Sequence, residues 1–289
     1  MLNIDLHSHS TASDGLLSPE DLVKRAARRD VKVLALTDHD DISGLAAAYE
    51  TALRLGVHLI SGVEISVTWN GQTIHVVGLQ VDPRHPVLLQ GLQTVRSSRA
   101  LRAEKIASEL EKTGIHGALE GAYAHAENPS LIGRAHFARY IVKQGRAADV
   151  KSVFKKFLTR GKPGYVEHRW AALADAVTWI KQSGGLAVVA HPGRYPLSSK
   201  QMRQLLAEFK QLGGVAVEVV TGSHTPEHYA VFARYAKEFG LLASAGSDFH
   251  GPGESRHDVG QLPGLPLDCL PVWQQFTGLK SVADAEAYK

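Results

Sequence analysis

The chain has 289 residues, of which 44% are hydrophobic and 21% are charged, a composition typical of a soluble globular protein with a sizeable core. Its single cysteine excludes a disulfide within the chain and fits a reducing compartment. No apolar run approaches the roughly 18 residues that a membrane-spanning helix requires, so we expect a cytoplasmic protein with no membrane segment.

The formal net charge of +3 is unevenly distributed along the chain. Residues 86–168 contain 14 Lys/Arg and 7 Asp/Glu, whereas the remaining residues contain 18 Lys/Arg and 22 Asp/Glu. A basic middle segment between acidic flanks indicates that this segment faces an anion.

Apolar runs with strand character alternate with amphipathic helical segments over the first 85 residues. The pair Ser18–Pro19 marks the start of the first helix, because serine caps a helix and proline fits its first position. The predicted elements are, in chain order, a strand at 2–6, a helix at 19–30, a strand at 31–40, a helix at 41–56 and strands at 57–67 and 73–81.

Helical periodicity without a strong strand signal extends over residues 86–168, with amphipathic segments at 97–114 and 130–145. The segment is too apolar and too poor in glycine and serine for a linker, so we interpret it as a helical insertion. After it the alternation resumes, with helices predicted at 173–185, 199–212 and 225–240 and strands at 186–192, 214–220 and 241–251.

Alternating strands and helices predict an α/β fold with a parallel sheet and right-handed crossovers. An open sheet and a closed barrel both satisfy the alternation, and the positions of the polar residues favour a barrel. We therefore expect a metal-binding barrel formed by residues 1–85 and 169–289, interrupted by a substrate-capping insertion at 86–168.

Histidine and acidic residues follow several of the predicted strands. His7 and His9 come directly after the first strand and are two positions apart, so both side chains can point to one face. Because the carboxyl ends of the strands of an α/β barrel meet at its active-site face, residues far apart in the chain would converge there. The candidates, in chain order, are His7, His9, Asp14, His39, Glu64, His75, His191, Asp248 and His250.

Imidazole and carboxylate groups packed into a core cost several kcal/mol unless something compensates them, and bound cations would do so. The set lacks thiolates, which suits Mn²⁺, Fe²⁺ or Zn²⁺ and argues against a cysteine-type structural zinc site. Nine ligands are too many for one tetrahedral ion. We therefore expect two to three divalent metals, with a carboxylate such as Glu64 bridging two of them and with Asp38 orienting a ligand.

Six motifs, HSHSTASDG, LTDHD, GVEIS, HVVG, AHP and GSDFH, occur in this order between residues 7 and 250. Together they resemble the motifs of the polymerase-and-histidinol-phosphatase (PHP) family of phosphoesterases. The resemblance implies a distorted (β/α)₇ barrel with three metals at its mouth, Mn²⁺ being the first choice. It implies three ligand sets: His7, His9, Glu64 and Asp248; Glu64, His75 and His191; and Asp14, His39 and His250.

The segments LIGRAHFARYIV and RGKPGYV of the insertion resemble the branch of this family that hydrolyses 3′,5′-nucleoside bisphosphates and degrades short RNA from its 5′ end. The implied enzyme is a phosphoric ester hydrolase with Asp248, His191 and Glu64 as catalytic residues. Its partners would be a small nucleotide or a short single-stranded RNA, with no obligate protein partner. The candidate substrate-binding residues are Arg99, Arg134, His136, Lys162, Arg194, His224 and His257.

Two other functions remain open from the sequence. A histidinol-phosphate phosphatase would use the same metal ligands, but a basic insertion favours a substrate with more negative charge than one phosphate monoester. A polymerase-associated nucleic-acid-binding module would fit the isoelectric point of about 8.9, although a net charge of +3 is small for binding duplex DNA.

Overall fold

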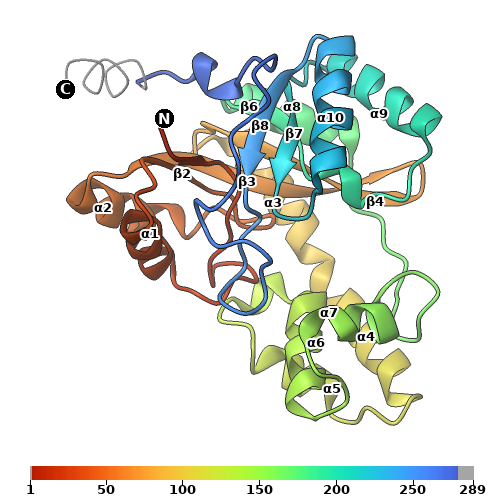
Figure 1. The fold of residues 1–289 in the computed structure, drawn as a ribbon. Coiled ribbons are helices and arrows are strands. Elements are labelled where there is room, and N and C mark those ends of the chain that lie inside the picture. The colour runs from red at the N-terminus through yellow and green to blue at the C-terminus, as the bar shows by residue number, and fades with distance from the viewer. Residues whose placement is uncertain (1, 279–289) are drawn as a thin grey trace.

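The computed structural model describes residues 2–278, and one sheet forms its centre (Figure 1). Seven strands follow one another in the order β1-β2-β3-β4-β6-β7-β8, and the short strand β5 pairs with β3. Their bounds are β1 Ile4–Asp5, β2 Val33–Leu36, β3 His58–Trp69, β4 Gln72–Leu79, β5 Ala171–Ala172, β6 Leu186–Val189, β7 Ala216–Thr221 and β8 Leu242–Gly246.

The first and last strands of this sheet approach each other and nearly close a barrel. The backbone N–H of Leu6 donates to the carbonyl of Ala245 at 3.0 Å, and Ser8 forms a parallel bridge with Phe249. The predicted distorted barrel of the α/β class is therefore confirmed.

One strand of the sheet runs against its neighbours. β4 is antiparallel to both β3 and β6, whereas the other pairs along the sheet are parallel. A two-residue turn with positive φ at both Asn70 (45°) and Gly71 (71°) joins β3 to β4, as in the tight turns that suit twisted hairpins. The simple alternation of strand and helix, which predicts only parallel neighbours, does not hold at this hairpin.

Helices cover the outside of the barrel, α1 and α2 on one side and α8, α9 and α10 on another (Figure 1). Sequence signals set their ends: the Ser18 hydroxyl accepts from the N–H of Asp21 at 3.2 Å, and Gly56 ends α2 with a left-handed φ of 68°. Their bounds are α1 Pro19–Arg28, α2 Leu45–Leu55, α8 Leu173–Gln182, α9 Ser199–Leu212 and α10 Pro226–Glu238.

Residues 86–168 contain helices and no strand, as the helical periodicity predicts. The helices are α3 Pro86–Ser97, α4 Arg99–Glu111, α5 Ala118–Tyr123, α6 Arg134–Lys143 and α7 Val150–Val153. Those from α4 to α7 lie beside the barrel (Figure 1) and enclose a hydrophobic cluster of their own, which runs from Ala103 to Leu158. By contrast, Leu88 and Leu92 of α3 pack in the barrel's cluster. The division at residues 85 and 168 stays a prediction.

None of the helices described between residues 2 and 278 is long and apolar enough to cross a membrane.

Gly91 allows α3 to pack closely against α8. A Cβ atom at this position would overlap the indole ring of Trp179. We expect Gly91→Ala to destabilise the protein by about 1–3 kcal/mol, the usual cost of overpacking, although alanine favours the helix. Urea denaturation would measure the free energy of unfolding, with Gln93→Ala on the exposed face of α3 as the control. An unchanged or higher midpoint for Gly91→Ala would contradict this packing.

Candidate metal centre

The loop after β1 brings two histidines into the mouth of the barrel. His7 and His9 are fully buried, and their Nε2 atoms lie 3.1 Å apart. Two backbone hydrogen bonds fix this loop. The N–H of His9 donates to the carbonyl of Phe249 at 2.9 Å, and the N–H of Asp248 donates to the carbonyl of His7 at 2.8 Å. The same hydrogen bonds place the loop after β8 beside it.

Glu64, in the middle of β3, is the centre of the cluster. Its Oε2 lies 3.3 Å from Nε2 of both His7 and His9 and 3.0 Å from Nδ1 of His39. Its Oε1 lies 3.0 Å from Nδ1 of His75 and 2.9 Å from Nε2 of His191. The two oxygens therefore face different sets of imidazoles, the arrangement that a bridging carboxylate requires.

Eight of the nine predicted ligands form three overlapping groups, each compact enough to hold one metal ion, and His191 lies beside the third group. Within a group, the potential ligand atoms all lie within 4.8 Å of one another. The groups are His7, His9, Glu64 and Asp248; His9, Asp14, His39 and His250; and His39, Glu64 and His75, with His191 Nε2 3.3 Å from His75 Nδ1.

The donor atoms of these groups fit metal binding, because several of them lack any other partner. Buried atoms without a hydrogen bond include one nitrogen or oxygen from each of His9, Asp14, His39, Glu64 and Asp248. Buried polar atoms are nearly always satisfied in folded proteins. Imidazoles with carboxylates and no thiolate suit Mn²⁺, Fe²⁺ or Zn²⁺.

The charges of the cluster shift the pKa values of its members strongly. Burial would raise the pKa of Glu64, but the imidazoles of His75 and His39 outweigh it and hold that pKa well below its usual value. Burial would lower the pKa of His9, but Asp248 and Glu64 raise it to about 10. Burial and the charge of Arg194 lower the pKa of His191 to about 3, so this ring is neutral and ready to coordinate a metal.

Glu218 of β7 supports two of the candidate ligands, and it is not among the predicted site residues. Its Oε1 lies 2.7 Å from Nδ1 of His7, and its Oε2 accepts the backbone N–H of His191 at 2.6 Å. A carboxylate on the second ring nitrogen fixes the orientation of a metal-binding histidine. His191 has a φ of 27°, a strained value that this hydrogen bond helps to hold. The available signal is a charged residue inside the apolar run GVAVEVV.

Two other buried carboxylates position the loops that carry the ligands. Asp38 accepts from the backbone N–H and hydroxyl of Ser10 and from the hydroxyl of Ser13, so it holds the turn before Asp14. Asp5 accepts the N–H of Ser247 at 2.8 Å, directly before Asp248. Asp38 thus fixes the backbone near the ligands.

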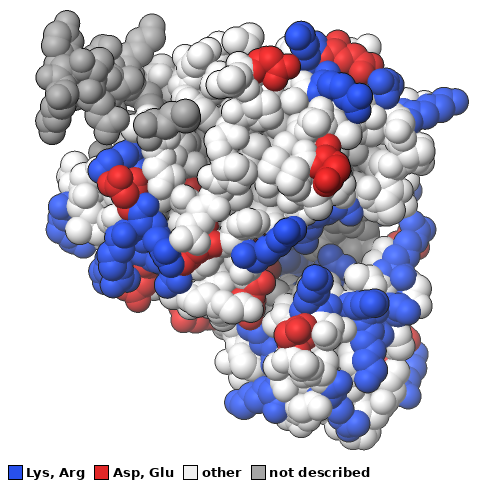
Figure 2. Space-filling view, in the orientation of Figure 1, with Lys and Arg blue, Asp and Glu red and all other residues white. Residues whose placement is uncertain are grey.

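The predicted substrate-binding residues fall into different surroundings. Arg194 lies at the mouth, half exposed, and its Nη1 donates to Asp248 Oδ2 at 2.7 Å. Arg134 is partly buried, lies over the ring of Phe154 and donates to the carbonyl of Leu158 at 3.2 Å. The charge of Arg194 acts on Arg134, and Figure 2 shows a hollow between the barrel and α4 to α7 with Lys and Arg side chains around it.

The other candidates are held by the protein itself or lie in loops. Arg99 forms a buried ion pair with Asp40. His224 is bound through both ring nitrogens to the backbone, at Val219 and at Gly193 beside Arg194. Lys162 is exposed in the loop after residue 158, and His257 is half buried in the loop after β8.

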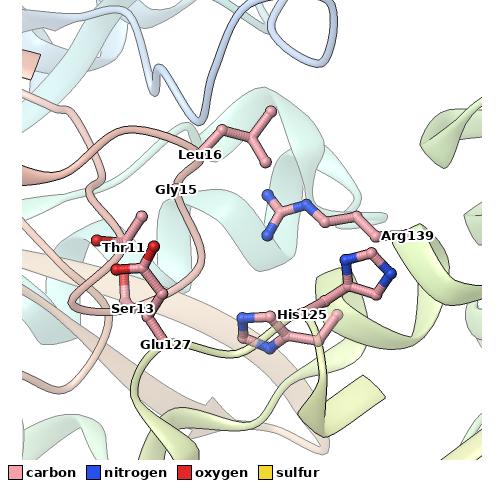
Figure 3. Close-up of a pocket in the computed structure, with 8 residues that line it drawn as sticks. Thr11, Ser13, Gly15, Leu16, His125, Glu127 and Arg139 are labelled. Carbon is pink, nitrogen blue, oxygen red and sulfur yellow. The ribbon is translucent and has the colours of Figure 1, made fainter. Parts of the chain in front are cut away.

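His136 lines a small cavity next to the loop that carries Asp14. The cavity is about 100 Å³ and lies between the 11–16 loop and the 125–139 segment (Figure 3). Arg139 lies at its side, donating to both carboxylate oxygens of Glu254 and to the carbonyl of Asp14. Nδ1 of His136 accepts the N–H of Gly133 at 3.0 Å.

Comparisons with known proteins agree with this geometry. The family model of the PHP domain matches residues 5–242. The chain is 48% identical over 276 residues to the 3′,5′-nucleoside bisphosphate phosphatase of Chromobacterium violaceum, covering 96% of this chain and 97% of that protein. It is 44% identical over 284 residues to the 5′-3′ exoribonuclease Rnm of Escherichia coli, covering 98% and 96%.

A solved structure has the same fold over nearly the whole chain. The structure of an amidohydrolase from Chromobacterium violaceum, with bound sulfate and no metal, is 48% identical and matches with a TM-score of 0.92. The match covers 94% of this chain and 95% of that one.

Because the ligand groups overlap, substitutions of different ligands should remove different amounts of metal from the protein. Glu64 belongs to two groups and Asp14 to one, so we expect Glu64→Gln to lose more metal per chain than Asp14→Asn. The Asp14 group is also the more exposed, its Asp14 and His250 side chains being 16% and 22% accessible, and chelators should remove its ion first. Elemental analysis after dialysis would test this, with the exposed Asp149→Asn as the control. Equal losses in the two ligand variants would contradict the bridging role.

Metal affinity should increase with pH. In the metal-free protein, carboxylates outweigh burial and raise the pKa of His7 well above 6.5 and that of His9 to about 10. Both rings must lose a proton to coordinate metal, so affinity rises as pH rises towards those values, by about tenfold per pH unit for each proton released. Chelator-competition titrations between about pH 6.5 and 9 would measure it, with the exposed His116→Ala as the control. An affinity that is constant or falls over this range would contradict the protonation states.

Proposed function

The chain belongs to the PHP-domain family, and we propose that it is a metal-dependent phosphoesterase that hydrolyses one phosphate of 3′,5′-nucleoside bisphosphates. The observation that carries this proposal is the buried carboxylate of Glu64 between five imidazoles at the barrel mouth. The phosphatase and exoribonuclease relatives match almost the whole chain, so neither a histidinol-phosphate phosphatase nor a polymerase-associated module is favoured.

The ligands that we propose for the metals are the three groups at the mouth, with Mn²⁺ as the first choice and Fe²⁺ or Zn²⁺ as alternatives. Bound divalent metals supply charge neutralisation for the phosphoryl oxygens and a more acidic water for the attack. Glu64, His191 and Asp248 hold this centre together, and Arg194, paired with Asp248 at the mouth, presents its guanidinium to the phosphate oxygens. Arginine is suited to this, since its planar fork matches a phosphate.

The same site suits short RNA with a 5′-phosphate. The first linkage of such an RNA is attached to the 3′-oxygen of the first ribose, and a second phosphate lies on the 5′-oxygen of the same sugar. A 3′,5′-bisphosphate presents the same two groups. We therefore assign the 3′-phosphate to the metal centre and the 5′-phosphate to the basic side of the mouth, and we expect the enzyme to degrade such RNA from its 5′ end.

The bisphosphate should be a far better substrate than a monophosphate. The 5′-phosphate does not react, so its binding energy can position the phosphate that does, and losing it should lower kcat as well as raise KM. The test compares adenosine 3′,5′-bisphosphate with adenosine 3′-monophosphate as substrates of the metal-loaded enzyme. Arg134→Ala should lower kcat/KM for the bisphosphate by about 10- to 150-fold, as expected for losing a hydrogen bond to a charged group.

Two outcomes would count against the proposal. Equal kcat/KM values for the two nucleotides in the wild type would refute the requirement for two phosphates. A short RNA with a 5′-hydroxyl that is degraded as fast as the 5′-phosphorylated one would refute the corresponding requirement in RNA. Arg160→Ala, which removes an exposed charge near the end of the same basic segment, is the control for a general effect of charge.

A further inference from the structure

The three ligand groups at the mouth are held in two different ways. Glu64 and His75 belong to the β3–β4 hairpin, and Glu218 of the barrel holds the ring of His7 and the backbone of His191. The Asp14 group, by contrast, depends on residues 86–168, the helical segment. Three of its ligands lie in loops that arginines of this segment contact, namely Asp14, His39 and His250.

Arg139 of α6 connects two of these loops. Its buried guanidinium donates to both carboxylate oxygens of Glu254, at 2.8 and 2.9 Å, and to the backbone carbonyl of Asp14. Glu254 lies in the turn after His250, in which the hydroxyl of Ser255 accepts the N–H of His250 at 2.7 Å. One side chain therefore fixes the loop of Asp14 relative to the loop of His250.

The loop that carries Asp14 is held by polar contacts on the side that faces the helical segment. The cavity of about 100 Å³ lies there, between residues 11–16 and 125–139, and Arg139 lines it (Figure 3). From the same segment, Nδ2 of Asn128 donates to the carbonyl of Ala12 at 3.0 Å. Asn128 and Arg139 thus bind the carbonyls of residues 12 and 14 beside a space that no side chain fills.

The third ligand, His39, is also supported from the helical segment. Arg96 of α3 donates to the carbonyl of Asp40 at 2.8 Å, and Arg99 of α4 pairs with the Asp40 carboxylate. Asp40 directly follows His39 in the chain. Side chains of α3, α4 and α6 therefore hold the loops of three of the four ligands of the Asp14 group.

We propose that the helical segment keeps the Asp14 group in its metal-binding arrangement, with Arg139 as the central positioning residue. The proposal rests on the metal centre of the proposed function and adds a role for the segment that does not involve the substrate. Since linkage is reciprocal, any affinity that the docked segment gives to the metal ion, the ion returns as stability of the docked segment.

The test is a calorimetric titration of the chelator-treated protein with Mn²⁺. Arg139→Met keeps the apolar stem and removes the guanidinium, and we expect it to raise the Kd of the Asp14 group by about 10- to 100-fold, the usual effect of losing a group that orients a ligand. The Kd values of the other groups should not change. Asp14→Asn identifies the binding step that belongs to the Asp14 group, because it should weaken that step most.

The direction of the change separates positioning from charge. Removing a positive charge near the mouth would by itself strengthen the binding of a cation, so a higher Kd in Arg139→Met reports lost positioning. Arg203→Met is the matched control. Arg203 makes the same two-bond contact with a carboxylate, that of Glu238, but it joins α9 to α10 on the outside of the barrel. Its Kd values should equal those of the wild type.

A second variant removes a contact without changing the charge. Asn128→Ser keeps an oxygen that can accept the N–H of Ser130, as Asn128 does at 3.2 Å, but is too short to reach the carbonyl of Ala12. It should weaken the same binding step, and it decides the matter should Arg139→Met not fold.

Hydrogen exchange tests the reciprocal effect. In the wild type, Mn²⁺ should slow the exchange of amides both in residues 11–16 and in α6. In Arg139→Met the protection by Mn²⁺ should no longer extend to α6.

The outcomes separate this proposal from the function on which it rests. A wild type that binds no Mn²⁺ at the Asp14 group would overturn the metal centre itself. Normal metal binding at that group in both Arg139→Met and Asn128→Ser would overturn only the positioning role. An equal rise of Kd at all groups, or the same rise in Arg203→Met, would also overturn it, because the effect would then be a general loss of stability.

Discussion

The burial of Glu64 is the constraint on which the rest of the molecule depends. A fully buried carboxylate is unfavourable alone, and this one is surrounded by the rings of His7, His9, His39, His75 and His191. Those rings are buried or partly buried as well, so each needs support from elsewhere. Glu218 supplies it for the ring of His7, whereas His9 is held through its backbone N–H, which donates to the carbonyl of Phe249. The barrel mouth is thus a network of polar groups that hold one another in position and leave ligand atoms available for cations.

The antiparallel strand β4 makes this cluster possible. Glu64 and His75 do not follow strand ends but lie within the long β3–β4 hairpin, where Ser66 is directly opposite His75. Glu64 is two residues from Ser66 and shares its face, so the carboxylate and the imidazole are diagonal neighbours. Because the hairpin extends further than the parallel strands, two of its side chains reach across the mouth to ligands that come from loops.

Local patterns predict most of the fold and the convergence of the nine polar residues, but not the contacts that hold them. Caps and periodicity place helices such as 199–212, which the structure reproduces. The antiparallel direction of β4 depends on a turn whose two positive φ values favour a hairpin. The alternation of strands and helices in the sequence does not indicate this direction. Glu218 and Asp40 act through residues 27 and 59 positions away. Such pairings are set by tertiary packing, which a single sequence shows only as a charge in an apolar strand or beside a motif.

The positive charge of residues 86–168 has two uses, which a count of charges cannot separate. Arg96 donates to the carbonyl of Asp40, Arg99 pairs with the Asp40 carboxylate, and Arg139 holds Glu254 and the carbonyl of Asp14. These arginines neutralise acidic groups of the barrel and fix the loops that carry candidate ligands, so they couple the helical segment to the metal centre. Their charge is therefore not free for a substrate. What remains for a second anion is an arginine such as Arg134, which forms no ion pair with a carboxylate of the described residues and lies over the ring of Phe154.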